Sequence, residues 1–210
     1  MRTVLKILLL VAIGALLYMC VQSILTPVNF DKQKLVREGA IVERLIEIRN
    51  AQLGYKNRMG HFAANFDELK KFLNEEKLPF IIKEGVLTDE QLKAGMTEQK
   101  AVQEGLIRRD TTWVLAKDTL LNPHYDVASI SKVPGFENVS FSLDTATLVS
   151  SSGYIIPVFE CKVPFDVYLG DLDRQLLVNL KDKTEKLGRY NGLRVGSITE
   201  VNNNAGNWEF

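Results

Sequence analysis

Histidine is scarce in this chain, and its positive and negative charges cancel. Only two histidines occur among 210 residues, His61 and His124. Neither stands at the short distance from a second ligand that marks zinc sites, such as HxxxH or HxH. The 26 basic side chains are matched by 26 acidic ones, so the chain lacks the basic excess of a nucleic-acid-binding protein. We therefore expect no metal site, no cofactor and no nucleic-acid partner.

Cysteine is equally scarce. Cys20 lies in an apolar run near the start of the chain, and Cys161 lies far along it. This separation predicts that no disulfide joins them. We expect Cys161 to be a small apolar residue within a strand, because free cysteine behaves in this way when it is buried.

The chain also lacks the common motifs of nucleophilic and phosphate-binding enzymes. Ser151 lies in a Ser-Ser-Ser-Gly run that suggests a nucleophile with His124 and Asp126 as its partners, but no GxSxG or SxxK motif occurs. Such a run is more typical of a hairpin turn, although a serine triad is defined by geometry and not by spacing. The segment GLRVG, at 192–196, lacks the Lys-Ser/Thr of a P-loop. We assign no catalytic residue and expect a protein that is not an enzyme.

Neighbouring carboxylates and asparagines have simpler explanations than chemistry. The pairs Asp171/Asp173 and Glu75/Glu76 are interpreted as helix-end and surface charges and not as an acid–base pair. The run of asparagines at 202–204 indicates a turn, with a glycan or peptide site as the alternative.

A long uncharged run is the most informative feature that is present. Residues 7–30, ILLLVAIGALLYMCVQSILTPVNF, carry no charge, and about 20 apolar residues suffice to cross a bilayer. Three interpretations compete: a cleaved signal peptide, a lipoprotein acylated at Cys20, and an uncleaved single-pass anchor. The run lacks a clear small-x-small cleavage site, which argues against a cleaved signal peptide. The bulky Tyr18 and Met19 precede Cys20, where lipoproteins usually carry small residues, and this argues against acylation. The pattern favours an uncleaved transmembrane anchor at residues 1–30.

Flanking charges predict the orientation of this anchor. Arg2 and Lys6 precede the run and favour a cytoplasmic N-terminus, while three basic residues at 32–37 weaken the bias. A short basic segment before the first apolar run usually stays inside. We expect an inner-membrane protein whose residues 31–210 lie in the periplasm, with a cytoplasmic domain as the alternative.

An amphipathic pattern follows the anchor. Thr26-Pro27 predicts an end or a kink of the membrane helix, and Asn29 or Asp31 is suited to cap a new helix. Gly60 is placed to end that helix in the left-handed conformation, and a bend is expected at Gly39. Apolar residues recur every three or four positions on one face, namely Leu35, Ile41, Leu45, Ile48, Ala51, Tyr55 and Met59.

Shorter elements complete the pattern. Asn65 and Glu68 form a capping-box pattern at the start of a second helix, which Leu78-Pro79 ends. Brief helical turns are expected after Thr88 and Thr97. The remaining patterns predict strands at 79–85, 106–121, 136–144, 146–170 and 192–199, and a helix at 171–188.

These elements predict an α+β fold with an N-terminal transmembrane helix and a long amphipathic helix packed on a mainly antiparallel sheet. The expected organisation is a membrane anchor at 1–30 and one periplasmic α+β domain at 31–210. A lobe boundary is expected near 122–134. Trp208 is expected to dock on this domain.

The segment RLIEIRNAQLGYKNRMGHFAANFDELKKFL, at 44–73, resembles the place where type IV pilin-like and pseudopilin-like proteins leave their long first helix. The positions that carry this resemblance are Tyr55, Gly60, Phe62, Phe66 and Leu69. The resemblance implies an anchor helix whose second half packs on an antiparallel sheet. The chain departs from the prepilin leader, because Gly14-Ala15 lie inside the apolar run and Met19 stands where that family has glutamate. Processing by a prepilin peptidase and assembly into a filament are therefore not expected.

The whole chain also resembles uncharacterised membrane-anchored envelope proteins of Bacteroidetes. Together these patterns predict a structural or adaptor protein of the cell envelope that presents a pilin-like domain for contacts with a protein partner or with further copies of itself. The alternative is a membrane-tethered envelope hydrolase or a module that binds glycans or peptides.

Overall fold

A computed structural model describes residues 2–84, 95–106, 108–121, 125–136, 138–150 and 152–209. The chain divides into two compact units. Unit 1 comprises Met1–Arg49 and Ser131–Phe210, and unit 2 comprises Asn50–Ile130. The helical turn expected after Thr88 lies outside the described residues.

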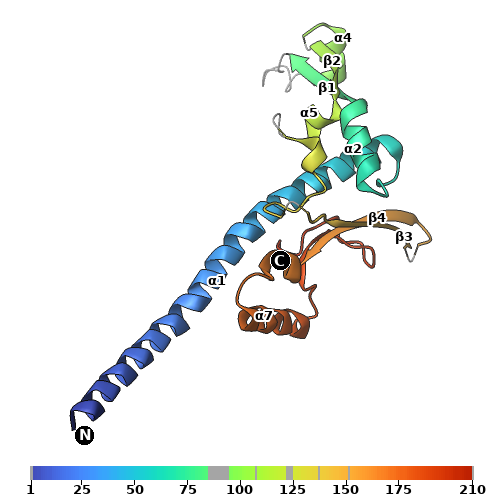
Figure 1. Ribbon diagram of the computed structural model, residues 1–210. Helices are drawn as coiled ribbons and strands as arrows, with labels where there is room; N and C mark the ends of the chain where they lie inside the picture. Colours follow the sequence, from blue (N-terminus) through green and yellow to red (C-terminus); the bar gives the residue numbers. More distant parts are fainter. Residues whose placement is uncertain are drawn as a thin grey trace. The chain divides into compact units, whose positions relative to one another are not determined.

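Helix α1 (Arg2–Met59) is a single helix of 58 residues with Pro27 inside it (Figure 1). The helix does not end at Pro27, and the prediction of a new start at Asn29 or Asp31 is wrong. A proline inside a helix removes one amide donor and costs about 3 kcal/mol. The residues on either side keep their own backbone bonds, so the helix continues.

Unit 1 contains a three-stranded antiparallel sheet in the order β3–β4–β5. Its strands are β3 (Ser142–Val149), β4 (Ile155–Pro164) and β5 (Gly192–Gly196). The central strand β4 alternates Phe159, Cys161 and Val163 towards one face, and all three are buried. Burial raises the pKa of the Cys161 thiol well above its ordinary value. The prediction of Cys161 as a small apolar strand residue is therefore confirmed.

The part of α1 that belongs to unit 1 packs on this sheet and completes its core. Ile41, Leu45 and Ile48 are fully buried, as their spacing predicts. Phe30 is also buried, although it ends the uncharged run. The predicted stripe is wrong at Leu35, which is 75% exposed and so lies outside the buried face of α1. The predicted α+β fold, with a long helix packed on small antiparallel sheets, is confirmed.

Two helices follow β4 in unit 1. The first, α6 (Phe165–Leu169), begins directly after Pro164 and lies within a stretch predicted to be extended, so that prediction is wrong there. Its Phe165, Tyr168 and Leu169 are buried because a short helix turns all three towards the core. The second, α7 (Arg174–Lys186), confirms the predicted helix; Asp173 caps its start and Gly188 follows its end with φ +65°.

Unit 2 begins with the end of α1, where Gly60 has the predicted left-handed conformation (φ +84°). Asn65 caps α2 (Phe66–Glu75): its side chain accepts from the Glu68 amide at 2.9 Å, and the Glu68 carboxylate accepts from the Ala64 amide at 3.0 Å. Tyr55 packs edge-on against Phe72, with ring centroids 5.1 Å apart. The predicted cap of the second helix is confirmed.

The rest of unit 2 is a two-stranded antiparallel ribbon with short helices. Its elements are β1 (Lys77–Glu84), α4 (Glu98–Gln103), β2 (Arg108–Leu115), α5 (Ala116–Leu120) and the 3-10 turn η1 (Val127–Ser129). Pro79 lies opposite Trp113 in the ribbon. The strand predicted at 106–121 is therefore too long, because its last residues form α5, in which Ala116 is buried.

Candidate functional site

Of the residues that the sequence singles out for chemistry, the structure describes His61 and Asp126, and these two have separate local contacts. His61 lies in the turn after α1, with its ring 5.6 Å from that of Tyr55 and its Nδ1 3.1 Å from the Phe62 carbonyl oxygen. His124 and Ser151 lie outside the described residues. Asp126 caps η1 by accepting from the Ala128 amide at 3.0 Å. Within the described ranges, no group of three or more His, Cys, Asp or Glu side chains is arranged to hold a metal ion.

The neighbouring carboxylates and asparagines have structural roles. Asp173 accepts from the Leu176 amide at 2.9 Å at the start of α7. Asn203 and Asn204 have φ values of 54° and 59°, which places them in a left-handed turn that asparagine tolerates.

Arg37 of α1 holds the loop between α6 and α7. Its two terminal nitrogens donate to the two carboxylate oxygens of Asp171 at 2.5 and 2.7 Å, and one of them also donates to the Tyr168 carbonyl. The guanidinium lies 5.5 Å from the centre of the Phe136 ring. The hydrogen bond from Arg37 lowers the pKa of Asp171 below its ordinary value. This bidentate pair therefore joins α1 to the loop after α6.

The Arg37–Asp171 pair predicts an acid-sensitive contribution to the stability of unit 1. Because the pKa of Asp171 is lower in the folded state, the contribution is complete above the ordinary carboxyl pKa and is lost as the pH falls through the lowered one. We expect Asp171→Asn to lower the midpoint of thermal unfolding at neutral pH. Between about pH 5 and pH 3, the midpoint of this variant should fall by less than that of the wild type. The control Asp182→Asn alters an exposed pair with Lys186 and should keep the wild-type pH profile. Equal profiles for Asp171→Asn and the wild type would contradict the assignment.

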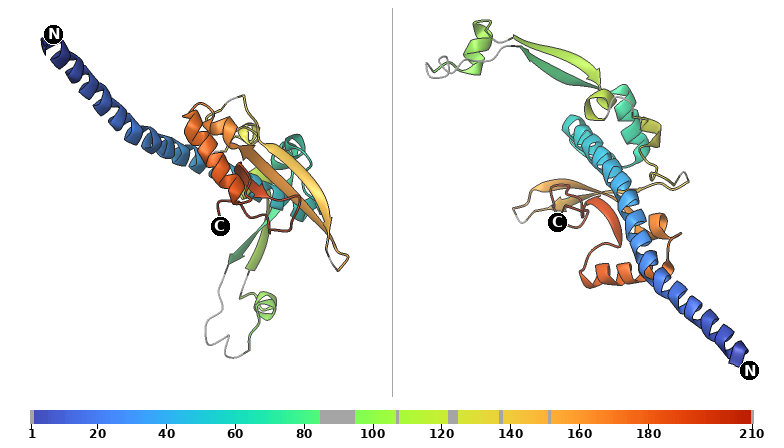
Figure 2. Two further views of the ribbon diagram at one scale, coloured as in Figure 1. Left: turned by 90° about the horizontal axis from the view of Figure 1, so that it is seen from below. Right: turned by 90° about the vertical axis from the view of Figure 1, so that its left-hand side faces the viewer.

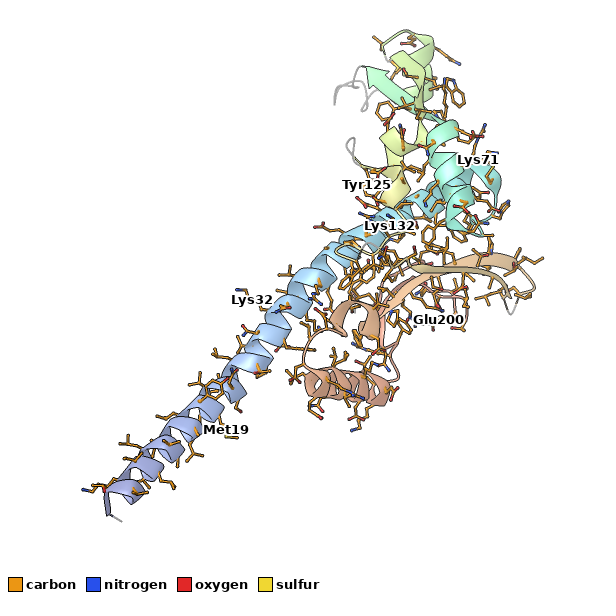
Figure 3. All side chains as sticks on the ribbon, in the orientation of Figure 1. Met19, Lys32, Lys71, Tyr125, Lys132 and Glu200 are labelled. Carbon is orange, nitrogen blue, oxygen red and sulfur yellow. The ribbon has the colours of Figure 1, made fainter. Side chains whose placement is uncertain are left out.

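One face of the unit 1 sheet carries a chain of ion pairs. Glu160, only 5% exposed, accepts from Lys162 at 2.6 Å and from Arg194 at 3.5 Å. Lys162 also lies 3.3 Å from Asp144, and Arg194 lies 3.7 Å from Glu200, which is labelled in Figure 3. The hydrogen bond to Glu160 raises the pKa of Lys162. Each charge in this cluster is engaged by another, so the cluster stabilises the sheet and offers no unpaired acid or base.

The first half of α1 is an uncovered apolar surface. None of its most apolar 18-residue stretch is buried by other described residues. Figure 3 shows side chains of this stretch, Met19 among them, projecting from the ribbon with no other element of unit 1 beside them. This helix is long and apolar enough to cross a membrane, and a signal sequence has the same length and composition.

A groove of about 320 Å3 lies beside the next part of α1. Lys34 and Glu38 of α1 line one side, and the other side comes from α7, the segment after it and the last residues of the chain. Figures 1 and 2 show α7 alongside α1 in unit 1. The lining from those segments includes Leu180, Lys183, Thr184, Leu187, Arg189, Tyr190 and Trp208. The groove thus combines positive charge with aromatic and aliphatic surface.

The charges of this groove do not cancel. Glu38 accepts from Lys34 at 2.9 Å and from the Tyr168 hydroxyl at 3.1 Å, so its carboxylate is already engaged. Within the described part of the chain, the side chains of Lys183 and Arg189 form no ion pair. Their positive charges therefore remain for an anion.

An exposed apolar hairpin end is the second unpartnered feature of unit 1. Val149 and Ile155 face each other where β3 and β4 meet the turn, and Tyr154 precedes Ile155. The three side chains are 70–73% exposed. Aromatic and aliphatic side chains in such a position are common in protein–protein contacts. In unit 2, Phe80 and Trp113 on the β1–β2 ribbon are also more than half exposed.

No pattern in the sequence predicts the groove, because its lining comes from four separate stretches of the chain. The only sequence signal is the placement of Trp208 on the domain, where its side chain is half-buried. Comparison with protein-family models, curated proteins and solved structures finds no match to this chain.

Proposed function

We propose that this protein is a membrane-anchored structural or adaptor protein that presents a pilin-like α+β domain for protein–protein contacts in the cell envelope. The observation that carries the proposal is the continuity of α1. Its first half is apolar and uncovered, and the same helix supplies Ile41, Leu45 and Ile48 to the core of unit 1. An anchor that is continuous with a domain core holds that domain at the membrane surface without a linker. The proposed location is the inner membrane, with the domain in the periplasm.

Two further observations support an adaptor over an enzyme. The charged side chains around Glu160 bind one another, so they stabilise the fold and leave no activated nucleophile among themselves. The apolar hairpin end at Val149, Tyr154 and Ile155 provides a surface suited to a protein partner.

The anchor predicts a large effect of charge on membrane retention. Leu9 and Leu16 are exposed within the apolar run, and an arginine at the centre of a membrane helix costs about 2.5–3.5 kcal/mol on insertion. We expect the wild type to stay in the membrane pellet after sodium carbonate extraction and Leu9→Arg/Leu16→Arg to be lost from it. Leu35→Arg is the matched control, because Leu35 is an exposed leucine of the same helix outside the run.

Two outcomes would contradict the anchor. One is a wild type that carbonate extracts, or whose mature form lacks residues 1–30 by mass spectrometry, which would identify a signal sequence. The other is retention of the double arginine variant at the wild-type level. A fusion of alkaline phosphatase after Phe210 reports the compartment of the domain, since that enzyme is active only in the periplasm.

The adaptor role is tested by a photo-crosslinking amino acid at Tyr154, with Glu185 on α7 as an exposed control position. We expect a discrete adduct from Tyr154 in membranes of the native host and none from Glu185. If neither Tyr154 nor Val149 yields an adduct above background, the hairpin end loses its role and the adaptor proposal loses its main surface.

A further inference from the structure

The groove between α1 and α7 has a chemical character that the proposed adaptor role does not use. Three cations, Lys34, Lys183 and Arg189, line it with a single carboxylate, Glu38. Lys34 and the Tyr168 hydroxyl engage that carboxylate, so the surplus is the charge of Lys183 and Arg189. A surplus of two positive charges in a concave site favours an anionic ligand.

The groove also offers neutral hydrogen-bond donors. Within the described chain, neither the Tyr190 hydroxyl nor the Trp208 indole nitrogen forms a hydrogen bond, although both residues line the groove. Leu187, 61% exposed, adds apolar surface at the rim. Tryptophan beside lysine and arginine is the combination found where proteins meet the headgroup region of a bilayer, because indole has an apolar body and a polar edge.

The position of the groove along α1 relates it to the membrane. Lys6 and Lys34 stand on either side of the uncharged run and are 28 positions apart (34 minus 6). At 1.5 Å per residue this is about 42 Å, and a bilayer with its headgroups is about 40–45 Å thick. Lys34 therefore lies at the level of the headgroups when Lys6 lies at the opposite surface.

The fold also reaches down to that level. Phe30, the last residue of the uncharged run, is covered by unit 1, so no spacer separates the groove from the lipid surface. Figure 2 shows α7 beside α1 and not at the far end of the sheet. The volume of the groove, about 320 Å3, is at the lower end of the range for ligand pockets. This size suits a headgroup and not a large glycan.

We propose that this groove binds the phosphate-bearing headgroup of an anionic phospholipid from the leaflet on which unit 1 rests. Lys183 and Arg189 bind the phosphate, Tyr190 and Trp208 donate hydrogen bonds to the headgroup oxygens, and Leu187 contacts the start of the acyl chains. This inference rests on the proposed function, because it takes α1 as the membrane anchor. It adds a lipid preference to that role.

The test uses the full chain in neutral detergent micelles, with Trp113→Phe so that Trp208 is the only tryptophan. The micelles are titrated with phosphatidylglycerol or phosphatidylcholine while Trp208 emission is recorded. We expect a saturable change with phosphatidylglycerol and at least a tenfold weaker response to phosphatidylcholine. Each basic residue near an anionic lipid surface contributes about fivefold in affinity, so Lys183→Gln/Arg189→Gln should weaken the phosphatidylglycerol response by more than tenfold.

The controls separate the groove from general basicity and from free anions. Lys186→Gln removes a cation from α7 that pairs with Asp182 and does not line the groove, and it should shift the response by less than twofold. Inorganic phosphate and glycerophosphoglycerol replace the lipid in parallel titrations and are expected to bind at least tenfold more weakly. Circular dichroism of each variant checks that it is folded.

Three outcomes would overturn the proposal: equal responses to the two lipids, an unchanged response in the double variant, or binding of free phosphate as tight as that of the lipid. The last outcome would assign the groove to a soluble anion. Carbonate extraction tests the anchor separately, and the micelle titration does not require insertion into a bilayer. If the lipids give equal responses while membrane retention is normal, only the headgroup site is refuted. If the wild type is not retained in the membrane, the anchor is refuted.

Discussion

Replacing Gly196 with alanine is expected to lower the free energy of unfolding of unit 1 by about 2–5 kcal/mol. Gly196 has φ +72°, a conformation that costs other residues about 1–2 kcal/mol. A Cβ at this position would also lie 2.2 Å from the Phe159 carbonyl oxygen. That atom belongs to the backbone of the central strand β4, so it cannot move without disturbing the pairing of β4 with β5.

The matched control is Gly188→Ala. Gly188 has a similar φ of +65°, but a Cβ there would meet nothing within 4 Å. We expect the free energy of unfolding of this variant to fall by only about 1–2 kcal/mol, which is the cost of the left-handed conformation for alanine. Urea unfolding followed by Trp208 emission, in a Trp113→Phe background, measures both variants. If the two alanines have equal effects, the close approach to β4 does not contribute.

Replacing Gln52 with leucine is expected to destabilise unit 2 by about 2–4 kcal/mol. Gln52 is fully buried in α1. Its side-chain oxygen accepts from the Ala63 amide at 2.9 Å, and its side-chain nitrogen donates to the Ala63 carbonyl at 3.0 Å. Leucine fills the space but leaves both backbone groups of the buried Ala63 without these partners, and each such group costs about 1–3 kcal/mol.

Amide hydrogen exchange and urea unfolding together test this prediction. In a Trp208→Phe background, Trp113 reports the unfolding of unit 2. We expect a lower midpoint for Gln52→Leu and an Ala63 amide that exchanges at least tenfold faster. Gln33→Leu, an exposed glutamine of the same helix, should change stability by less than about 0.5 kcal/mol. A Gln52→Leu variant with wild-type stability and a protected Ala63 amide would show that these bonds do not hold the turn.

The groove that we assign to a lipid headgroup is not predicted by the sequence, whereas the α+β fold is. Its residues are far apart in sequence: Lys34 is on α1, Lys183 and Arg189 are near the end of α7, and Trp208 is near the end of the chain. Each alone is an ordinary surface residue in the sequence. Only the packing of α7 and of residues 197–209 beside α1 and β5 places them around one concavity.

Spacing in the sequence predicts which face of α1 is buried but not how far the burial extends. Ile41, Leu45 and Ile48 follow the predicted stripe. Leu35 and Met59 share its spacing but remain exposed, because a residue is buried only where another element covers it. Phe30 shows the converse: its place in the uncharged run indicates an anchor, and the fold of unit 1 covers it.

The sequence predicts helix caps and glycine turns correctly, because these depend on bonds and conformations within a few residues. The cap at Asn65, the left-handed Gly60, the end of a helix before Gly188, and the cap of α4 by Thr97, which accepts from the Lys100 amide at 3.4 Å, are all as predicted. Strand boundaries were less reliable. The strand expected at 136–144 begins only at Ser142, because the preceding residues form a turn in which the Phe136 amide donates to the Val133 carbonyl.

The sequence by itself therefore determined the apolar segment, the buried face of the long helix, the caps and turns, and the α+β class, because each depends on neighbours within a few residues. Tertiary structure alone decided two other features. These are the mutual neutralisation of charges around Glu160 and the positive groove beside Lys34. The groove brings together residues up to 174 positions apart (208 minus 34), and such an arrangement follows from how the elements pack and not from any local pattern.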